Sequence, residues 1–349
     1  MELTMRRLRK EARMAMKNEA VDKLIAAMRQ GDQIIEHAQA QAMSALRGSA
    51  MGGRVVEGGD LLGRIDAGPD IAEVRKQVEA RVGKLILTLA RSPEAMGGLI
   101  ATLDDQDPYV RQKVAYALGV TKSPLAVDPL IAAMTDGYLG VQQTAIRALR
   151  GIKDPKAVEP LIGVAKGEVK EGNRTGAPDF RSIREDAVIA LGKMKDPRAV
   201  EPLIELAMVD SGLQSRALEA LGSIKDVSAI EPLIALARDE DSDYRDTAVR
   251  TLGEIPDPRS VEPLIGLLSD AQSSEWTAEE AAVSLGKIGD ARTVEPLIAA
   301  LQDSDSPILS QVAWALNKIT GKTFLFGNQS QKKWRKWWER SKETMLKGR

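Results

Sequence analysis

A short phrase built around one proline recurs along the chain and constrains the fold more than any other feature. AVDPLI, AVEPLI, AIEPLI, SVEPLI and TVEPLI share one slot, and a weaker MGGLI places glycine in it, which gives Gly98, Pro129, Pro160, Pro202, Pro232, Pro263 and Pro296. A second landmark, a leucine closing an A-L or similar dipeptide, falls at Leu118, Leu149, Leu191, Leu221, Leu252, Leu285 and Leu316. Both landmarks have a period near 31 residues and share one long interval of 42, so the chain is a true repeat.

Each repeat predicts two helices joined by a turn. Asp154-Pro155 and Asp196-Pro197 precede the first helix, with Asp as the cap and Pro at the first position. Apolar residues at helical spacing mark the second helix, as in VRQKVAYALG. We expect the glycines after the leucine landmark to end the second helices, at Gly119, Gly192, Gly222, Gly253 and Gly286. A pair this short cannot bury both of its faces, so neighbouring pairs must stack.

The pattern D-P-x-A-V-E-P-L-I with V-R-x-x-A-x-x-A-L-G-x-I resembles the HEAT-repeat family, in its short bacterial form with phycobilisome-lyase-type HEAT-like repeats. The resemblance implies an all-α fold, an α-solenoid in which stacked helix pairs form a right-handed superhelix. It also implies that the first helices lie on the convex side and that the second helices line the concave side.

The regularity of the repeat divides the chain into four regions. Regular repeats span 98–320, with a Gly-rich and charged loop insertion at 166–180 that accounts for the long interval. Degenerate repeats precede them over 19–97, interrupted by a Gly-rich insertion at 48–69. Residues 1–18 predict a basic helix, and 321–349 predict a C-terminal helix rich in Trp and Lys.

Composition excludes several chemistries. The 349 residues contain no Cys and only one His, which excludes thiolate sites and multi-histidine metal centres, so we expect no cofactor, metal or catalytic residue. The net charge of −1 conceals +4 on 1–17, −13 on 18–317 and +8 on 318–349. No secretory signal and no run of 18 apolar residues is present, which predicts a cytoplasmic protein without a transmembrane segment. A trimmed exported precursor is also compatible with the chain.

One slot of the second helix varies while its neighbours stay apolar or small. It lies three residues before the glycine position and holds Tyr116, Arg147, Ile189, Glu219, Arg250, Val283 and Trp314. Apolar, aromatic and oppositely charged side chains in one row favour a protein or peptide partner, whereas a nucleic-acid track would repeat Lys and Arg. The alternative interpretation is a solvent-exposed face without function, on which the residues vary freely.

Two charged rows have structural explanations. Arg111, Arg184 and Arg245 share a slot near the start of the second helix and predict hydrogen bonds between repeats. A row of lysines directly follows the second helices, where cations complement the helix dipole; a basic binding stripe is the alternative for Lys122, Lys153, Lys195 and Lys225.

The C-terminal sequence QKKWRKWWERSKETML places three tryptophans on one helical face, at Trp334, Trp337 and Trp338. Terminal repeats need a cover for their exposed apolar side, so we expect this helix to cap the stack. Trp with Lys and Arg also suits an anionic membrane surface or RNA, which is the alternative.

These features together predict a non-enzymatic HEAT-repeat scaffold or adaptor that binds a protein partner through its concave second-helix face. Two alternatives stay open. One is a HEAT-type lyase or chaperone that acts on a cofactor-bearing protein, as in bilin attachment, for which no catalytic residue can be assigned. The other is binding to an anionic membrane surface or RNA through the basic termini.

Overall fold

The computed structural model describes residues 93–168, 180–239, 242–270, 274–302, 308–322 and 330–347, together with Ala26. The expected helix at 1–18, the insertion at 48–69, most of the degenerate repeats and the interior of the 166–180 insertion lie outside these residues. The described residues divide into two compact units, the first ending at Ala157 and the second beginning at Val158.

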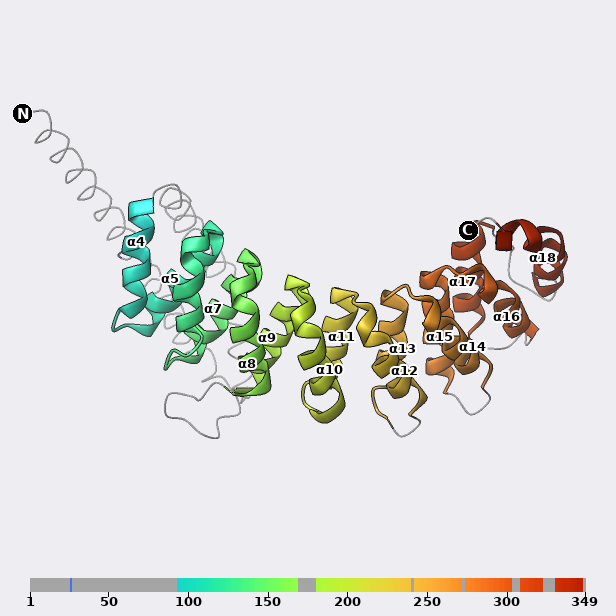
Figure 1. Ribbon diagram of the computed structural model, residues 1–349, viewed down its shortest axis with the longest axis horizontal. Helices are drawn as coiled ribbons and strands as arrows, with labels where there is room; N and C mark the ends of the chain where they lie inside the picture. Colours follow the sequence, from blue (N-terminus) through green and yellow to red (C-terminus); the bar gives the residue numbers. More distant parts are fainter. Residues whose placement is uncertain are drawn as a thin grey trace, which may run out of the picture. The chain divides into compact units, whose positions relative to one another are not determined.

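The first unit contains two helix pairs (Figure 1). Helix α4 (Pro93–Ala101), continued by the 3-10 turn η1 (Thr102–Asp104), pairs with α5 (Pro108–Thr121). The turn η2 (Pro124–Ala126) leads into α6 (Val127–Ala133), which pairs with α7 (Leu139–Ile152), and the unit ends in η3 (Pro155–Ala157). The two second helices, α5 and α7, pack directly against each other.

The second unit contains five helix pairs and a final single helix (Figure 1). The pairs are α8 (Val158–Lys166) with α9 (Phe180–Met194), α10 (Val200–Val209) with α11 (Gln214–Ile224), α12 (Ile230–Arg238) with α13 (Arg245–Glu254), α14 (Val261–Ser269) with α15 (Glu275–Ile288), and α16 (Val294–Ala299) with α17 (Leu309–Thr320). Short 3-10 turns join successive pairs at η4 (Pro197–Ala199), η5 (Val227–Ala229), η6 (Pro258–Ser260) and η7 (Ala291–Thr293), and η8 (Ala300–Gln302) follows α16 within the last pair. The last helix is α18 (Ser330–Lys347).

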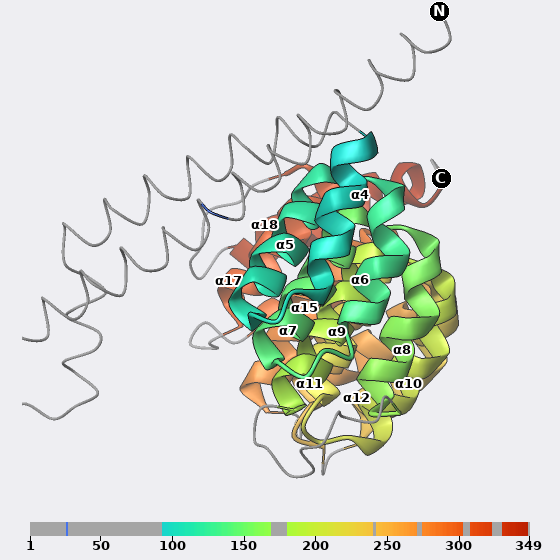
Figure 2. The same cartoon turned by 90° about the vertical axis from the view of Figure 1, so that its left-hand side faces the viewer.

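First and second helices occupy opposite sides of each stack. In the second unit, α8, α10 and α12 lie on one side and α9, α11 and α15 lie on the other (Figure 2). Each second helix packs against the next, from α9 through α11, α13 and α15 to α17. The described residues contain no β-strand, so the predicted all-α solenoid is confirmed.

A single 3-10 turn opens most first helices, and the Asp-Pro pairs explain why. The Asp196 carboxylate accepts the N–H of Arg198 at 3.0 Å, and Asp257 accepts the N–H of Arg259 at 2.9 Å. Proline follows each of these caps, where its fixed φ suits a helix start. The second proline, as in Pro202, is the third residue of its helix, where the missing N–H would have no partner. The predicted start signals are therefore confirmed.

The core consists of the small and aliphatic residues that the composition predicts. The leucine landmark marks its centre, because each of the seven leucines is at most 1% exposed: Leu118, Leu149, Leu191, Leu221, Leu252, Leu285 and Leu316. Alanines on the second helices fill the space between them, including Ala115, Ala145, Ala187, Ala217 and Ala248. Burial of the same leucine in every repeat accounts for its exact recurrence in the sequence.

The prediction that the landmark glycines end the second helices is wrong. Gly119 and Gly253 lie inside α5 and α13. They are needed because the next second helix comes too close for a side chain: a Cβ on Gly119 would lie 2.6 Å from the Cβ of Ala148, and a Cβ on Gly253 would lie 2.7 Å from the Cα of Ser284. Glycine permits such an approach of two backbones. These glycines therefore set the spacing between helices.

Candidate functional site

The variable slot lies on the open side of the second helices. Tyr116 is 55% exposed and Trp314 is 44% exposed. Arg147, Glu219 and Arg250 are exposed as well, and Ile189 and Val283 are half-buried. The residues on either side of the slot are buried, as Leu218 and Ala220 are around Glu219, with the exception of the half-buried Ala313 beside Trp314. Tyr116 and Arg147 belong to the first unit, and the other five slot residues belong to the second.

The arginine row joins neighbouring repeats. Arg111 of α5 binds Asp136 of the following repeat through two hydrogen bonds, of 2.7 Å to Oδ2 and 2.8 Å to Oδ1. Arg184 of α9 donates to Asp210 of the following repeat at 2.6 Å. The hydrogen bonds between Arg111 and Asp136 raise the pKa of the Arg111 guanidinium above its ordinary value. The predicted ladder is confirmed at these two positions, so these arginines serve the stack.

Arg184 and Arg245 also share a contact within their own repeats. Arg184 Nε donates to the carbonyl oxygen of Ala165 at 2.8 Å, and Arg245 Nε donates to that of Ala237 at 2.9 Å. Other side chains connect α13 to the next second helix: Thr277 donates to Asp246 at 2.6 Å, and Lys287 donates to Glu254 at 2.6 Å. Polar contacts between repeats therefore also run along the second helices, outside the arginine slot.

The lysine row has an unusual backbone conformation. Each lysine follows the end of a second helix with a positive φ, of 50° at Lys122, 62° at Lys153, 59° at Lys195 and 66° at Lys225. The left-handed conformation costs about 1–2 kcal/mol for a residue with a Cβ. A cation at a helix C-terminus contributes only about 0.3–1 kcal/mol. The helix dipole therefore does not account for lysine at these positions, where glycine would fit the backbone better.

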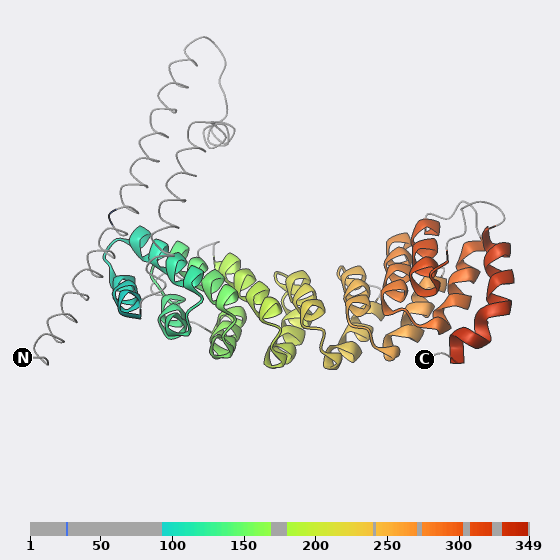
Figure 3. The same ribbon diagram turned by 90° about the horizontal axis from the view of Figure 1, so that it is seen from above.

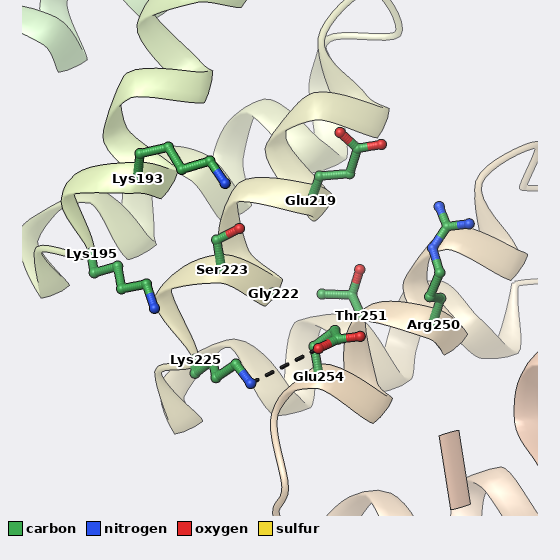
Figure 4. A pocket seen from close by; sticks show the side chains of 9 residues that line it. All are labelled: Lys193, Lys195, Glu219, Gly222, Ser223, Lys225, Arg250, Thr251 and Glu254. Carbon is green, nitrogen blue, oxygen red and sulfur yellow. Dashed lines mark ion pairs between the residues drawn. The ribbon is translucent and has the colours of Figure 1, made fainter. Parts of the chain in front are cut away.

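Two of these lysines border a cavity in the second unit. The cavity has a volume of about 340 Å³ and lies between α9, α11 and α13. Figure 4 shows Lys193, Lys195 and Lys225 along one edge and Glu219, Arg250 and Glu254 across from them. The lining is completed by Gly222, Ser223 and Thr251. The cavity is thus formed by the ends of three consecutive second helices.

The acidic residues of the cavity already have cationic partners. Glu254 accepts from Lys287 at 2.6 Å and lies 3.9 Å from Lys225. The hydrogen bond from Lys287 lowers the pKa of Glu254, and the charges of Lys287, Lys225 and Arg250 act in the same direction. Glu219 pairs with Arg216 at 3.0 Å. Among the described residues, Lys193 and Lys195 have no carboxylate within ion-pair distance, which leaves their edge of the cavity positive.

The structure brings together two rows that the sequence keeps apart. Glu219 and Arg250 come from the variable slot, and Lys195 and Lys225 come from the lysine row. Sequence reasoning missed Lys193, which belongs to neither row. A sequence signal for Lys193 exists, because Lys193 and Lys195 lie two residues apart around the end of the second helix, a pair that the other repeats do not have. Only the stacking of three helices shows that these groups face one cavity.

The C-terminal helix contacts the last repeat. Trp334 and Trp338 are 1% and 6% exposed, and Trp337 is half-buried with its ring edge-on to Trp334 at 5.7 Å. Helix α18 packs against α16, and Gln331 donates to the carbonyl oxygen of Ile298 at 3.2 Å. Figure 3 shows α18, in dark red, beside the last helix pairs. This placement supports the predicted cap, with the basic side chains of Lys332, Lys333, Arg335 and Lys336 exposed to solvent.

The described residues contain no cluster of three or more His, Asp or Glu side chains that could hold a metal ion. None of the described helices is both long enough and apolar enough to cross a membrane.

Stacked helix pairs of about 31 residues define an α-solenoid repeat protein. The sequence profile of HEAT repeats matches residues 96–177, 209–282 and 271–325, which is more than half of the chain. The profile of the PBS lyase HEAT-like repeat matches residues 183–207. The chain therefore belongs to the HEAT-repeat family, as the sequence predicts.

Solved structures of other repeat proteins are similar over most of the chain. The complex of CpcE and CpcF of phycocyanin lyase from Nostoc sp. is 25% identical, with a TM-score of 0.37, over 70% of this chain and 94% of that one. Human deoxyhypusine hydroxylase is 19% identical, with a TM-score of 0.33, over 72% and 91%. Importin beta is 13% identical, with a TM-score of 0.47, over 72% and 39%. No curated protein sequence matches the chain.

Proposed function

We propose that this protein is a non-enzymatic HEAT-repeat scaffold that binds a protein partner through the open face of its second helices. The observation that carries the proposal is the variable slot, which is exposed or half-buried in all seven described repeats, while the positions beside it are buried except for the half-buried Ala313. Exposed aromatic and arginine side chains such as Tyr116, Arg250 and Trp314 are the residue types that anchor protein interfaces. A rigid helix presents them at fixed positions, which reduces the entropy lost on binding.

The alternative within the same family is a lyase or chaperone that acts on a cofactor-bearing protein. It is supported by the PBS lyase HEAT-like repeat at residues 183–207. The chain has no Cys, and its one His lies outside the described residues, so the described part of the open face has no nucleophile or acid–base group of these types. Binding of a free bilin with a change in visible absorbance would favour this alternative over the scaffold.

The proposal is tested by identifying a partner and then measuring direct binding. Tagged wild-type protein captures partners from native lysate, and a partner is then purified for titration against variants. We expect Tyr116→Ala combined with Arg250→Glu to weaken binding at least about tenfold, because interface anchors of these types commonly contribute that much. Helicity and the melting temperature should stay unchanged, since both side chains are exposed.

The control places comparable changes away from the open face. Leu125 is 61% exposed in η2, directly before α6, and Arg238 is exposed at the end of α12, so both belong to first-helix elements. Leu125→Ala with Arg238→Glu should leave binding within about twofold of wild type, as is usual for residues outside an interface. Equal binding by the Tyr116/Arg250 variant and wild type would overturn the proposal.

A further inference from the structure

The cavity between α9, α11 and α13 has more cationic than acidic lining residues. Lys193, Lys195, Lys225 and Arg250 face it, against Glu219 and Glu254. Both glutamates are also paired with cations outside the lining, namely Arg216 and Lys287. Lys225 lies 3.9 Å from Glu254, and Arg250 lies 3.9 Å from Glu280. The positive charge that the surrounding described residues do not neutralise is therefore that of Lys193 and Lys195.

The backbone at this edge adds an independent observation. Lys195 and Lys225 both have the left-handed conformation, with φ of 59° and 66°. Lys122 and Lys153, which do not line the cavity, share this conformation, whereas the equivalent helix ends of α15 and α17 have glycine in it. Lysine thus stands in a conformation that glycine adopts more easily along the whole row, and the cavity distinguishes Lys195 and Lys225 within it. A non-glycine residue held in this conformation is a reason to look for a function of its side chain.

We propose that this cavity binds an acidic segment of the partner protein, with successive carboxylates meeting Lys193, Lys195 and Lys225. The inference rests on the proposed scaffold function and specifies the chemistry of the partner. Two of the lysines come from the end of α9 and the third comes from the end of α11, one repeat further along. Successive acidic side chains of an extended polypeptide can each contact one of these separated lysines. Complementary charge would also speed association with the partner and select against basic sequences.

The arrangement suits single carboxylates better than a phosphate group. Phosphate sites concentrate backbone N–H groups at a helix N-terminus or combine several arginine forks. Here the lining comes from the middle and C-terminal parts of helices, which offer no free N–H groups to a phosphate. Glu219 and Glu254 lie on the facing side and would repel a dense dianion. Carboxylates of the partner can stay on the lysine edge and avoid these two glutamates.

The test uses the full chain and a fluorescein-labelled peptide of alternating Glu and Ser, followed by fluorescence anisotropy at low ionic strength. An exposed ion pair changes affinity by up to about fivefold, so Lys195→Gly with Lys225→Gly should weaken binding by about tenfold. The matched control is Lys122→Gly with Lys153→Gly, which removes the same charge from the same backbone conformation outside the cavity. The control should bind within about twofold of wild type. A Lys195→Gln with Lys225→Gln variant should repeat the loss without glycine at either helix end.

Three results would overturn the proposal. The first is equal binding of the peptide by wild type and both cavity variants, and the second is an equal loss in the control. The third is calorimetric binding of inorganic phosphate, lost in the Lys195→Gly with Lys225→Gly variant, together with no binding of the Glu-Ser peptide, which would assign the cavity to phosphate. If the peptide fails to bind but the purified partner still depends on Tyr116 and Arg250, this inference is wrong and the scaffold function stands.

Discussion

The middle and last repeats of the second unit end their second helices in different ways. Helices α9 and α11 are followed by Lys195 and Lys225, whereas α15 and α17 are followed by Gly289 and Gly321, all with positive φ. The last repeat is also covered by the tryptophans of α18, while the lysine ends border an open cavity. In the last repeats, the residue after the second helix is thus glycine, which adopts a positive φ most easily. In the middle repeats, lysines stand where conformational stability alone would select glycine.

The largest effect is expected at the covered end. Trp334→Ala removes a side chain that is 1% exposed and should lower the free energy of unfolding by about 3–5 kcal/mol. Deleting residues 330–349 should also promote aggregation, because it uncovers the apolar side of the last repeat. Chemical denaturation and amide exchange in α16 and α17 measure the effect. Arg335→Ala, on the exposed side of the same helix, is the control, and an equal loss in both variants would mean that α18 is no cap.

The glycines inside the middle second helices should respond differently to a methyl group. Gly253→Ala places a Cβ 2.7 Å from the Cα of Ser284 and should cost about 1–3 kcal/mol through overpacking. At Gly222 the nearest atom would be Thr251 Cγ2 at 3.4 Å, an ordinary contact. Gly222→Ala should therefore be neutral or stabilise by up to about 1 kcal/mol through helix propensity. Equal melting temperatures for the two variants would contradict the assigned role of the glycines.

Exchanging the residues at the helix ends tests the comparison directly. Lys195→Gly and Lys225→Gly should each stabilise the fold by about 0.5–1 kcal/mol, because glycine relieves the left-handed conformation. Gly289→Lys should destabilise it by a similar amount, since its φ is 76°. Urea denaturation of the three variants measures the differences. A stability loss in the lysine-to-glycine variants would show that the lysines serve the fold and would remove the reason to assign them a function.

The smallest effect concerns pH at the cavity. The hydrogen bond from Lys287 lowers the pKa of Glu254, so the ionised glutamate stabilises the folded state. This contribution is fully present above the ordinary glutamate pKa of about 4.3 and is lost as the pH falls through the lowered value. Wild type should therefore lose slightly more stability on acidification below about pH 4.3 than Lys287→Met. Identical acid profiles would show that the pair contributes nothing measurable.

Local sequence signals predicted most of the fold. The 31-residue period, the Asp-Pro starts and the leucine landmark each depend on a residue and its immediate neighbours in the chain, and the structure confirms them. The exposure of Tyr116 and Trp314 also followed from helical periodicity, because a position between buried neighbours must face outward. These properties come from capping, helix geometry and burial within one repeat.

Other properties depend on the distance between repeats, which local signals do not contain. The sequence predicts the landmark glycines at helix ends, but the approach of the next helix explains Gly119 and Gly253, and lysines follow the ends of four second helices. The cavity likewise requires three helices at one spacing to bring Lys193 opposite Arg250. The sequence alone therefore determined the repeat, its helices and the direction in which its residues face. The tertiary structure decided which residues meet, because packing distance is a property of the stack and not of a single repeat.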